Sequence, residues 1–263
     1  MMNSITQKDV VIPSVRGKKK GDNGKVLIIG GSEDYVGALT LAGIAALRAG
    51  VDWVTVACPS KVGWAVHALS PDLVVSKFSG NYFTLSHAKK ALALAKQFDA
   101  VLIGNGIGRK SDSFVRAFVK KCSVPLIVDA DGIKAISLQD VDGALLTPHA
   151  GELKLLLKNS KLASKGFEKK LRGNVVLLKG ETDRIITSDG VLYNTTGNPG
   201  MTKAGTGDVL AGLCLGFLGQ GLSLRQSAVN GAFIAGALGD LLKKKKGYSY
   251  IASDLLMDIK KIF

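Results

Sequence analysis

Short apolar runs alternate with helical patterns along most of the chain, and this alternation limits the fold more than any other feature. The runs have the length and unbroken apolar character of strands that are buried on both faces. They lie at Lys25–Ile29, Trp53–Ala57, Leu73–Ser76, Ala100–Ile103, Pro125–Val128, Gly143–Leu146 and Asn174–Leu178. Strands separated by helices form parallel sheets with helices on both faces. The sequence therefore predicts an α/β fold with a mostly parallel central sheet.

Helical patterns fill the intervals between these runs and most of the final third of the chain. We expect helices at Gly37–Ala49, Leu85–Gln97, Ser111–Lys121, Gly151–Leu157, Leu162–Leu171, Asp208–Leu218, Leu224–Lys243 and Asp254–Ile262. Asp189-Gly190 separates the short runs Arg184–Ser188 and Val191–Asn194, which is a strong hairpin signal. The sheet should therefore have an antiparallel edge. No linker or repeat interrupts the pattern, so we expect one domain over residues 1–263.

Composition narrows the class of protein. Of the 263 residues 46% are apolar, which is enough for a sizeable core. Cys58, Cys122 and Cys214 lie far apart without metal-ligand spacing, which favours free thiols in a reducing compartment. We find neither a secretory signal nor an apolar run long enough to span a membrane, and we expect a cytoplasmic protein that does not bind membranes.

The formal net charge of +14 is compatible with nucleic acid or with an anionic small molecule as a partner. Much of the charge lies in two lysine runs, at residues 18–20 and 243–246. Neither run is interleaved with the aromatic residues of a single-strand binder. Solvated surface explains both runs, and we expect no nucleic-acid partner.

A glycine-rich segment, TGNPGMTKAGTGD at residues 196–208, directly precedes an apolar helix. Glycines let backbone amides approach an anion, and a helix N-terminus adds free N–H groups and a positive dipole end. The segment is suited to hold a transferring phosphoryl group. Asp208 would then lie where a carboxylate can take a proton from an attacking hydroxyl. The simpler interpretation is that Asp208 only caps the helix.

Four other candidate sites follow strands, at the sheet edge where α/β proteins bind ligands. Gly104–Gly108 is either a ligand loop or a structural turn. Asp129 and Asp131 could hold Mg²⁺ or orient a substrate, or could cap a helix. His149 and Glu152 could contact a substrate or organise a helix start. Lys179 could reach phosphates, or could be an exposed lysine before a turn. No Walker A or protein-kinase motif is present.

Six segments in order resemble the NAD(P)H-hydrate dehydratases, which are relatives of ribokinase. They are GGSEDYVGA, IGNGIG, DADGI, TPHAGE, LLKGETD and TGNPGMTKAGTGDVLAG. The resemblance implies a ribokinase-like three-layer α/β/α sandwich. It also implies a reaction in which ADP or ATP phosphorylates the ring hydroxyl of NADHX or NADPHX, the hydrates of the reduced cofactors. Loss of phosphate then restores NAD(P)H.

The resemblance also assigns roles to residues. Asp208 would be the base, and the phosphoryl group would be held by Gly205, Thr206 and Gly207. The nucleotide would contact Gly207 together with Lys179, Gly180, Glu181, Thr182 and Asp183. The hydrate would contact Asp208 together with Ala38, Gly106 and His149. Supporting roles would fall to Asp131, Glu152 and Asn198. Mg²⁺ would accompany the nucleotide phosphates, with no protein ligand assigned, and the protein would form a homo-oligomer, a tetramer or octamer.

The chain departs from the pattern at several points. It has Gly-Asn-Gly-Ile-Gly where Gly-Pro-Gly is usual and TPHAGE where TPHPGE is commoner. Asp183 stands where many members carry Thr, and Thr202-Lys203-Ala204 varies a small, glycine-rich run. These differences bear on nucleotide preference more than on the reaction.

Two other functions use the same features. A ribokinase-like kinase of another small molecule would share the glycine-rich loop but would release a stable phosphoester. A nucleotide-binding regulator would bind without turnover, and Asp208 argues against it.

Overall fold

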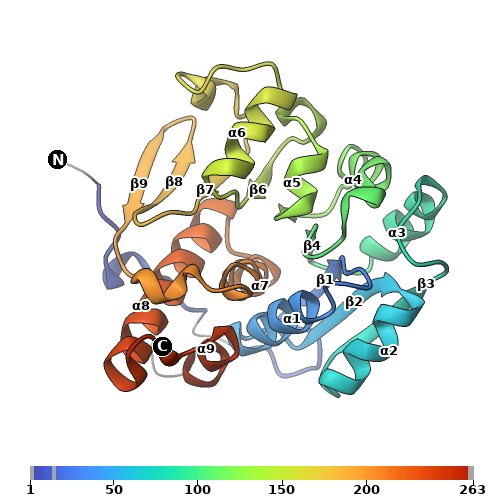
Figure 1. Ribbon diagram of the computed structural model, residues 1–263, viewed down its shortest axis with the longest axis horizontal. Coiled ribbons are helices and arrows are strands. Elements are labelled where there is room, and N and C mark those ends of the chain that lie inside the picture. Colours follow the sequence, from blue (N-terminus) through green and yellow to red (C-terminus); the bar gives the residue numbers. More distant parts are fainter. Residues whose placement is uncertain (1–2, 14–15, 260–263) are drawn as a thin grey trace.

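One sheet of nine strands forms the centre of the molecule (Figure 1). The computed structural model describes residues 3–13 and 16–259. The strand order is β3-β2-β1-β4-β5-β6-β7-β8-β9. Pairs from β3 to β7 are parallel, and β8 and β9 are antiparallel. The predicted mostly parallel sheet with an antiparallel edge hairpin is confirmed. The strands are β1 (Lys25–Ile29), β2 (Trp53–Pro59), β3 (Val74–Phe78), β4 (Ala100–Ile103), β5 (Leu126–Val128), β6 (Ala144–Leu146), β7 (Val175–Leu178), β8 (Asp183–Thr187) and β9 (Gly190–Asn194).

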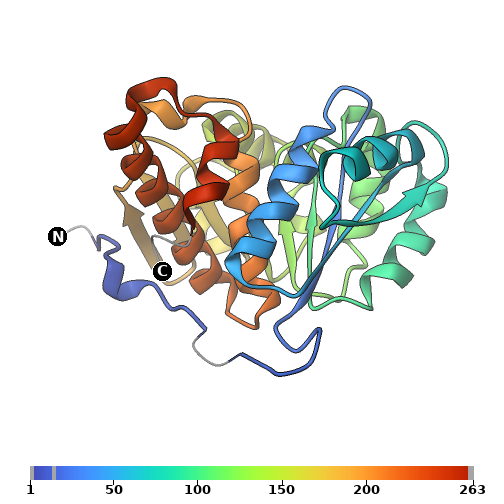
Figure 2. The same ribbon diagram turned by 90° about the horizontal axis from the view of Figure 1, so that it is seen from below.

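Helices cover the sheet on both sides and make a three-layer sandwich (Figures 1 and 2). On one side lie α1 (Gly37–Ala49), α2 (Ser60–Leu69), α7 (Thr206–Gly219), α8 (Leu224–Lys246) and α9 (Ala252–Asp258). On the other lie α3 (Ala88–Ala95), α4 (Asp112–Val119), α5 (Asp131–Ala135) and α6 (Ala150–Asn159). No helix among the described residues is both long enough and apolar enough to cross a membrane.

The central strands β4, β5, β6 and β7 are apolar and fully buried because both of their faces are covered, and β1 is buried after Lys25. In β1, Val26 and Ile28 belong to the core on the α1 side, and Leu27 and Ile29 belong to the core on the α4 side. All four side chains are fully buried. Successive side chains of a strand point to opposite faces, so a strand between two helix layers has few polar positions.

Several elements differ from those expected. Neither α2 nor the short α5 was expected. In α2, weak helix formers such as Gly63 are held in the helix by the burial of Val62 and Val66. The helix expected at Leu162–Leu171 was wrong: only a 3₁₀ turn forms there, at Phe167–Lys170, after the left-handed Gly166. The last helix starts earlier than expected and ends at Asp258, and Ile262 lies outside the described residues.

Close packing of α1 against α7 fixes the position of α7. The contact is made by small residues, because a methyl group at Gly212 would meet the backbone carbonyl of Ala42. One turn further along α7, a methyl at Gly216 would lie 2.6 Å from Cβ of Ala49. The helix axes can approach this closely only where side chains are absent. The packing therefore sets where the N-terminus of α7 meets the sheet.

We expect Gly212→Ala to lower the free energy of unfolding by about 1–3 kcal/mol, because the added methyl must displace backbone. Gly37→Ala is the matched control, since Gly37 begins α1 with open space at its Cβ position. It should change stability little or raise it slightly. Urea denaturation of both variants measures the difference, and equal effects would contradict the proposed close contact.

Candidate active site

Four polar side chains meet where β4, β5 and β7 end and α7 begins. This carboxylate cluster consists of Asn105, Asp129, Lys179 and Asp208. The Asn105 amide nitrogen donates to Asp208 Oδ1 at 2.6 Å and to Asp129 Oδ2 at 2.9 Å. Lys179 Nζ donates to Asp129 Oδ1 at 2.9 Å. Parallel strands end at one edge of the sheet, which brings these distant residues together.

The two carboxylates differ in how completely they are hydrogen-bonded. Asp129 is 2% exposed and accepts from Asn105, from Lys179 and from the Thr147 hydroxyl at 2.8 Å. Asp208 accepts one side-chain hydrogen bond among the described residues, from Asn105. Asp129 is thus a saturated counter-charge for Lys179, whereas Asp208 keeps an oxygen for a ligand.

Burial raises the pKa of the Asp208 carboxyl to about 6. The Asn105 hydrogen bond lowers this pKa, the negative charge of Asp129 raises it, and the positive charge of Lys179 lowers it. Burial alone would lower the pKa of Lys179, but the nearby carboxylates of Asp129, Glu152 and Asp208 outweigh burial and raise it. Lys179 therefore stays charged, while Asp208 can exchange a proton close to neutral pH.

Backbone strain accompanies the cluster at Ala130, which follows Asp129. Ala130 has φ 50° and ψ −122°, a conformation that favours glycine. Such strain persists only where surrounding structure imposes it, and it concentrates at functional sites. The Ala130 conformation makes the turn between β5 and α5, and the carboxylates on either side of it, Asp129 and Asp131, have different hydrogen-bond partners.

The glycine-rich loop shapes the start of α7. Gly205 is left-handed at φ 93°, and a methyl there would lie 2.7 Å from Leu41 Cδ1. The Thr206 hydroxyl donates back to the carbonyl groups of Met201 and Lys203, at 2.7 and 2.9 Å. A methyl at Gly207 would lie 3.6 Å from Lys179 Nζ. The first N–H groups of α7 and the lysine ammonium therefore border the same space.

Asn198 and Lys203 hold this loop in place. The Asn198 carbonyl oxygen accepts from the backbone of Gly200 and from the buried Tyr250 hydroxyl, and its amide donates to Asp240. Lys203 Nζ donates to the carbonyl oxygens of Tyr248 and Tyr250. Asn198 thus holds the loop in place by linking it to α8 and to the segment before α9.

The structure places Ala38 and Gly106 side by side, next to the cluster. A methyl at Gly106, which has φ 61°, would lie 3.6 Å from Ala38 Cβ. It would also crowd Tyr35, whose side chain is 61% exposed. The start of α1 and the loop after β4 therefore form one small-residue surface beside Asn105.

His149 and Glu152 cap α6 reciprocally. His149 Nδ1 accepts from the backbone of Gly151 and Glu152, and Glu152 accepts from the His149 N–H. Both lie near Lys179, because His149 and Lys179 form an isolated parallel bridge. The His149 side chain is 59% exposed, and its Nε2 lies 3.5 Å from Glu152 Oε1. The expected helix-start role is thus realised, and contact with a substrate stays a prediction.

Asp131 lies apart from Asp208. Its carboxylate accepts from the Gly108 backbone and from Lys134. Asp129 and Asp131 therefore do not share a metal position. Among the described residues no three carboxylate, histidine or cysteine side chains are grouped as metal ligands. A cation here would have to take most of its ligands from a bound molecule.

The predicted nucleotide segment forms the turn between β7 and β8. Gly180, Glu181 and Thr182 are exposed. Asp183 closes the turn by accepting from the Gly180 N–H at 3.1 Å and from the Asn194 amide, and burial raises its pKa. The turn begins at Lys179, so its accessible backbone continues directly from the cluster.

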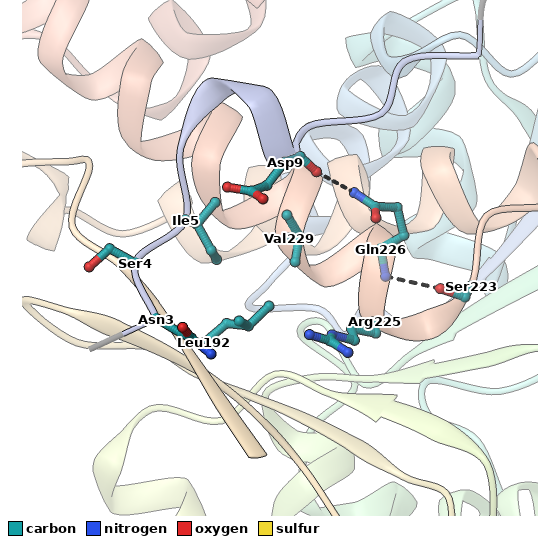
Figure 3. Close-up of a pocket in the computed structure, with 9 residues that line it drawn as sticks. All are labelled: Asn3, Ser4, Ile5, Asp9, Leu192, Ser223, Arg225, Gln226 and Val229. Carbon is teal, nitrogen blue, oxygen red and sulfur yellow. Dashed lines mark hydrogen bonds between the residues drawn. The ribbon is translucent and has the colours of Figure 1, made fainter. Parts of the chain in front are cut away.

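A cavity of about 710 Å³ lies elsewhere, between the N-terminal segment, β9 and the start of α8 (Figure 3). Gln226 crosses it to the Asp9 carbonyl, and Arg225 borders it. None of the predicted site residues lines it. The chemistry is concentrated at the carboxylate cluster.

Comparison with known proteins identifies relatives over nearly the whole chain. A family model described as NAD(P)H-hydrate dehydratase matches residues 26–261. The bifunctional NAD(P)H-hydrate repair enzyme Nnr of Methanothermobacter thermautotrophicus is 41% identical, over 93% of this chain and 51% of that protein. The chain spans about half the length of that protein and of three other curated bifunctional relatives that it matches.

Two further relatives match over nine-tenths or more of their length. The ADP-dependent (S)-NAD(P)H-hydrate dehydratase of Natrialba magadii is 34% identical, over 91% of this chain and 92% of that protein. The structure of the ADP/ATP-dependent NAD(P)H-hydrate dehydratase of Bacillus subtilis, co-crystallised with ATP and Mg²⁺, has a TM-score of 0.81 at 25% identity and covers 100% of both chains.

We expect Lys179→Met to lower the free energy of unfolding by about 3–5 kcal/mol, since it leaves the buried Asp129 charge without its partner. Lys61→Met is the matched control: its ion pair with Glu33 is exposed, and the change should stay within about 0.5 kcal/mol. Adding Asp129→Asn to Lys179→Met should recover part of the loss. Denaturant unfolding measures the stability of all three variants. Equal losses for the two single lysine variants would contradict a stabilising ion pair between Lys179 and Asp129.

We expect Asp208→Asn to be more stable than the wild type at pH 8, by roughly 2–3 kcal/mol. Because the pKa of Asp208 is raised to about 6 in the folded protein, its stabilising protonated form is lost as the pH rises through that value. Asparagine escapes this loss and can still accept from Asn105. The advantage should disappear towards pH 4. Unfolding across pH, with Glu33→Gln as an exposed control, tests the sign.

Proposed function

The chain belongs to the NAD(P)H-hydrate dehydratase family, and we propose that it uses a nucleotide to dehydrate (S)-NADHX or (S)-NADPHX back to NAD(P)H. The observation that carries the proposal is the contrast between the two carboxylates of the cluster. Asp129 is saturated, whereas Asp208 has an available oxygen and a pKa of about 6. A group with this pKa is ionised at neutral pH and can still hold a proton.

In the first step Asp208 takes the proton of the ring hydroxyl. The hydroxyl oxygen then bonds to the terminal phosphorus of ADP or ATP, and the bond from that phosphorus to its bridging oxygen breaks to release AMP or ADP. The backbone N–H groups of Gly205, Thr206 and Gly207 at the start of α7 would face the transferring group, and the Lys179 ammonium would border it. Fixed donors of this kind stabilise charge that develops on the phosphoryl oxygens.

In the second step the ring carbon–oxygen bond breaks and its electron pair leaves with phosphate. A neighbouring ring carbon loses a proton, and the double bond of the reduced nicotinamide ring is restored. The net products are NAD(P)H, inorganic phosphate and AMP or ADP. Phosphorylation is useful here because phosphate is a far better leaving group than hydroxide.

We propose binding surfaces that follow the family resemblance and lie beside the cluster. The Lys179–Asp183 turn would contact the nucleotide, while Ala38, Gly106 and His149 would contact the hydrate. Mg²⁺ would neutralise the nucleotide phosphates, whose oxygens would supply most of its ligands, since no group of three metal-binding side chains is found among the described residues. Cytoplasmic location and assembly into a tetramer or octamer also remain proposals.

The proposal is tested by absorbance at the NADH band, with NADHX, Mg²⁺ and either ADP or ATP. Absorbance should rise only with nucleotide, and inorganic phosphate should appear in equal amount. Asp208→Asn should reduce turnover by about 10²–10⁴-fold, because it removes the base. Asp142→Asn, which changes an exposed carboxylate, is the control and should leave turnover unchanged.

The product decides between the alternatives. A stable phosphoester without phosphate release would identify a small-molecule kinase, and nucleotide binding without any transfer would identify a regulator. An active Asp208→Asn enzyme would exclude Asp208 as the base.

A further inference from the structure

Asn105 connects the two carboxylates of the cluster. Its side chain is fully buried, and its amide nitrogen donates one hydrogen bond to each carboxylate. An amide nitrogen carries two hydrogens, so both are used. The contact to Asp208 is the shorter of the two, at 2.6 Å.

The orientation of this amide is fixed by its neighbours. Ionised carboxylates only accept hydrogen bonds, so the nitrogen and not the oxygen must face them. The Asn105 side-chain oxygen is then buried without a hydrogen-bond partner among the described residues. An unpaired buried carbonyl destabilises the fold, which is a reason to look for a role in function.

The backbone on either side holds Asn105 at this position. The backbone carbonyl oxygen of Asn105 accepts a hydrogen bond from the Gly31 N–H at 2.9 Å, which holds Asn105 against the end of β1. Gly104, at φ 124°, lies so close to the Asp129 carbonyl that no side chain fits there. The amide therefore cannot move away without disturbing β1 and β5.

We propose that Asn105 is a positioning residue for Asp208: its amide aims the Asp208 carboxylate at the substrate hydroxyl and keeps it ionised beside Asp129. The charged groups that face Asp208 are Asp129 from the end of β5 and Lys179 from the end of β7. Glu152 and Asp183 act on Lys179 from further out. Without the Asn105 amide, the carboxylates of Asp129 and Asp208 would face each other, and the one nearby ammonium, that of Lys179, is already bonded to Asp129.

This role rests on the proposed function, but the effect on Asp208 can be measured without turnover. Asn105→Leu keeps the approximate volume and removes both donors. The acid limb of kcat/KM for NADHX should move to higher pH by about one unit, because a hydrogen bond that favours the charged form is lost. The ¹³C carboxyl signal of Asp208, assigned by its absence in Asp208→Asn, should titrate with the same upward shift.

Asn174→Leu is the matched control. Asn174 is also buried and hydrogen-bonded, but it lies at the opposite end of β7 and its partners are the backbone of Ala144 and Val141. It should lower stability without moving the acid limb or the Asp208 signal. If Asn105→Leu does not fold, Asn105→Ser keeps a donor for one carboxylate only and should shift both readouts by a smaller amount.

An unchanged Asp208 titration in a folded Asn105 variant would overturn the proposal. If the wild type produced no NADH at all, the proposed function would fail, and the ¹³C titration would still decide the role of Asn105. A shift equal to that of Asn174→Leu would mean that any buried asparagine has this effect, which also overturns it.

Discussion

An ammonium and two carboxylates share the space where β4, β5 and β7 end, and most of that space is closed to water. Moving such ions out of water costs several kcal/mol each unless partners replace the lost hydration. Asp129 meets this requirement fully, with donors from Asn105, Thr147 and Lys179. Asp208 meets it only in part, and its raised pKa is the consequence. The uneven supply of donors is what separates a structural carboxylate from a reactive one.

The layer of helices behind the cluster makes this arrangement possible. α7 is apolar on all sides and buried along almost its whole length, so only its N-terminus can present polar groups. Its close contact with α1, through glycines and alanines, fixes that N-terminus opposite the ends of the strands. The same contact brings Ala38, at the start of α1, to the side of the cluster. Helix packing far from the chemistry thus determines which residues can meet the substrate.

The parallel sheet could be predicted because its central strands are covered on both faces and are therefore almost continuously apolar, and the hairpin could be predicted from the Asp189-Gly190 turn. Sequence reasoning located Asp208 and Lys179 because glycine punctuates the ends of their elements. It missed α2, whose helical conformation depends on tertiary burial of Val62 and Val66. It also gave no role to Asn105, although a polar residue between two glycines after a buried strand was a usable signal. The Asn105 contacts join positions 24 and 103 residues apart, and no local pattern encodes such distances.

The site is held together at a cost to the fold. Ala130 has a conformation suited to glycine, the Asn105 oxygen is buried without a partner among the described residues, and Asp208 is ionised in a place that disfavours its charge. Each feature opposes folding, yet all three lie within one cluster. If Asp208 were solvated like a surface carboxylate, its pKa would be lower and it would hold the substrate proton weakly. If Asp208 were buried beside Asp129 without Asn105 and Lys179, it would already be protonated at neutral pH and could not accept the substrate proton. The balance between burial and donors is therefore what allows a single aspartate to act as a base near neutral pH.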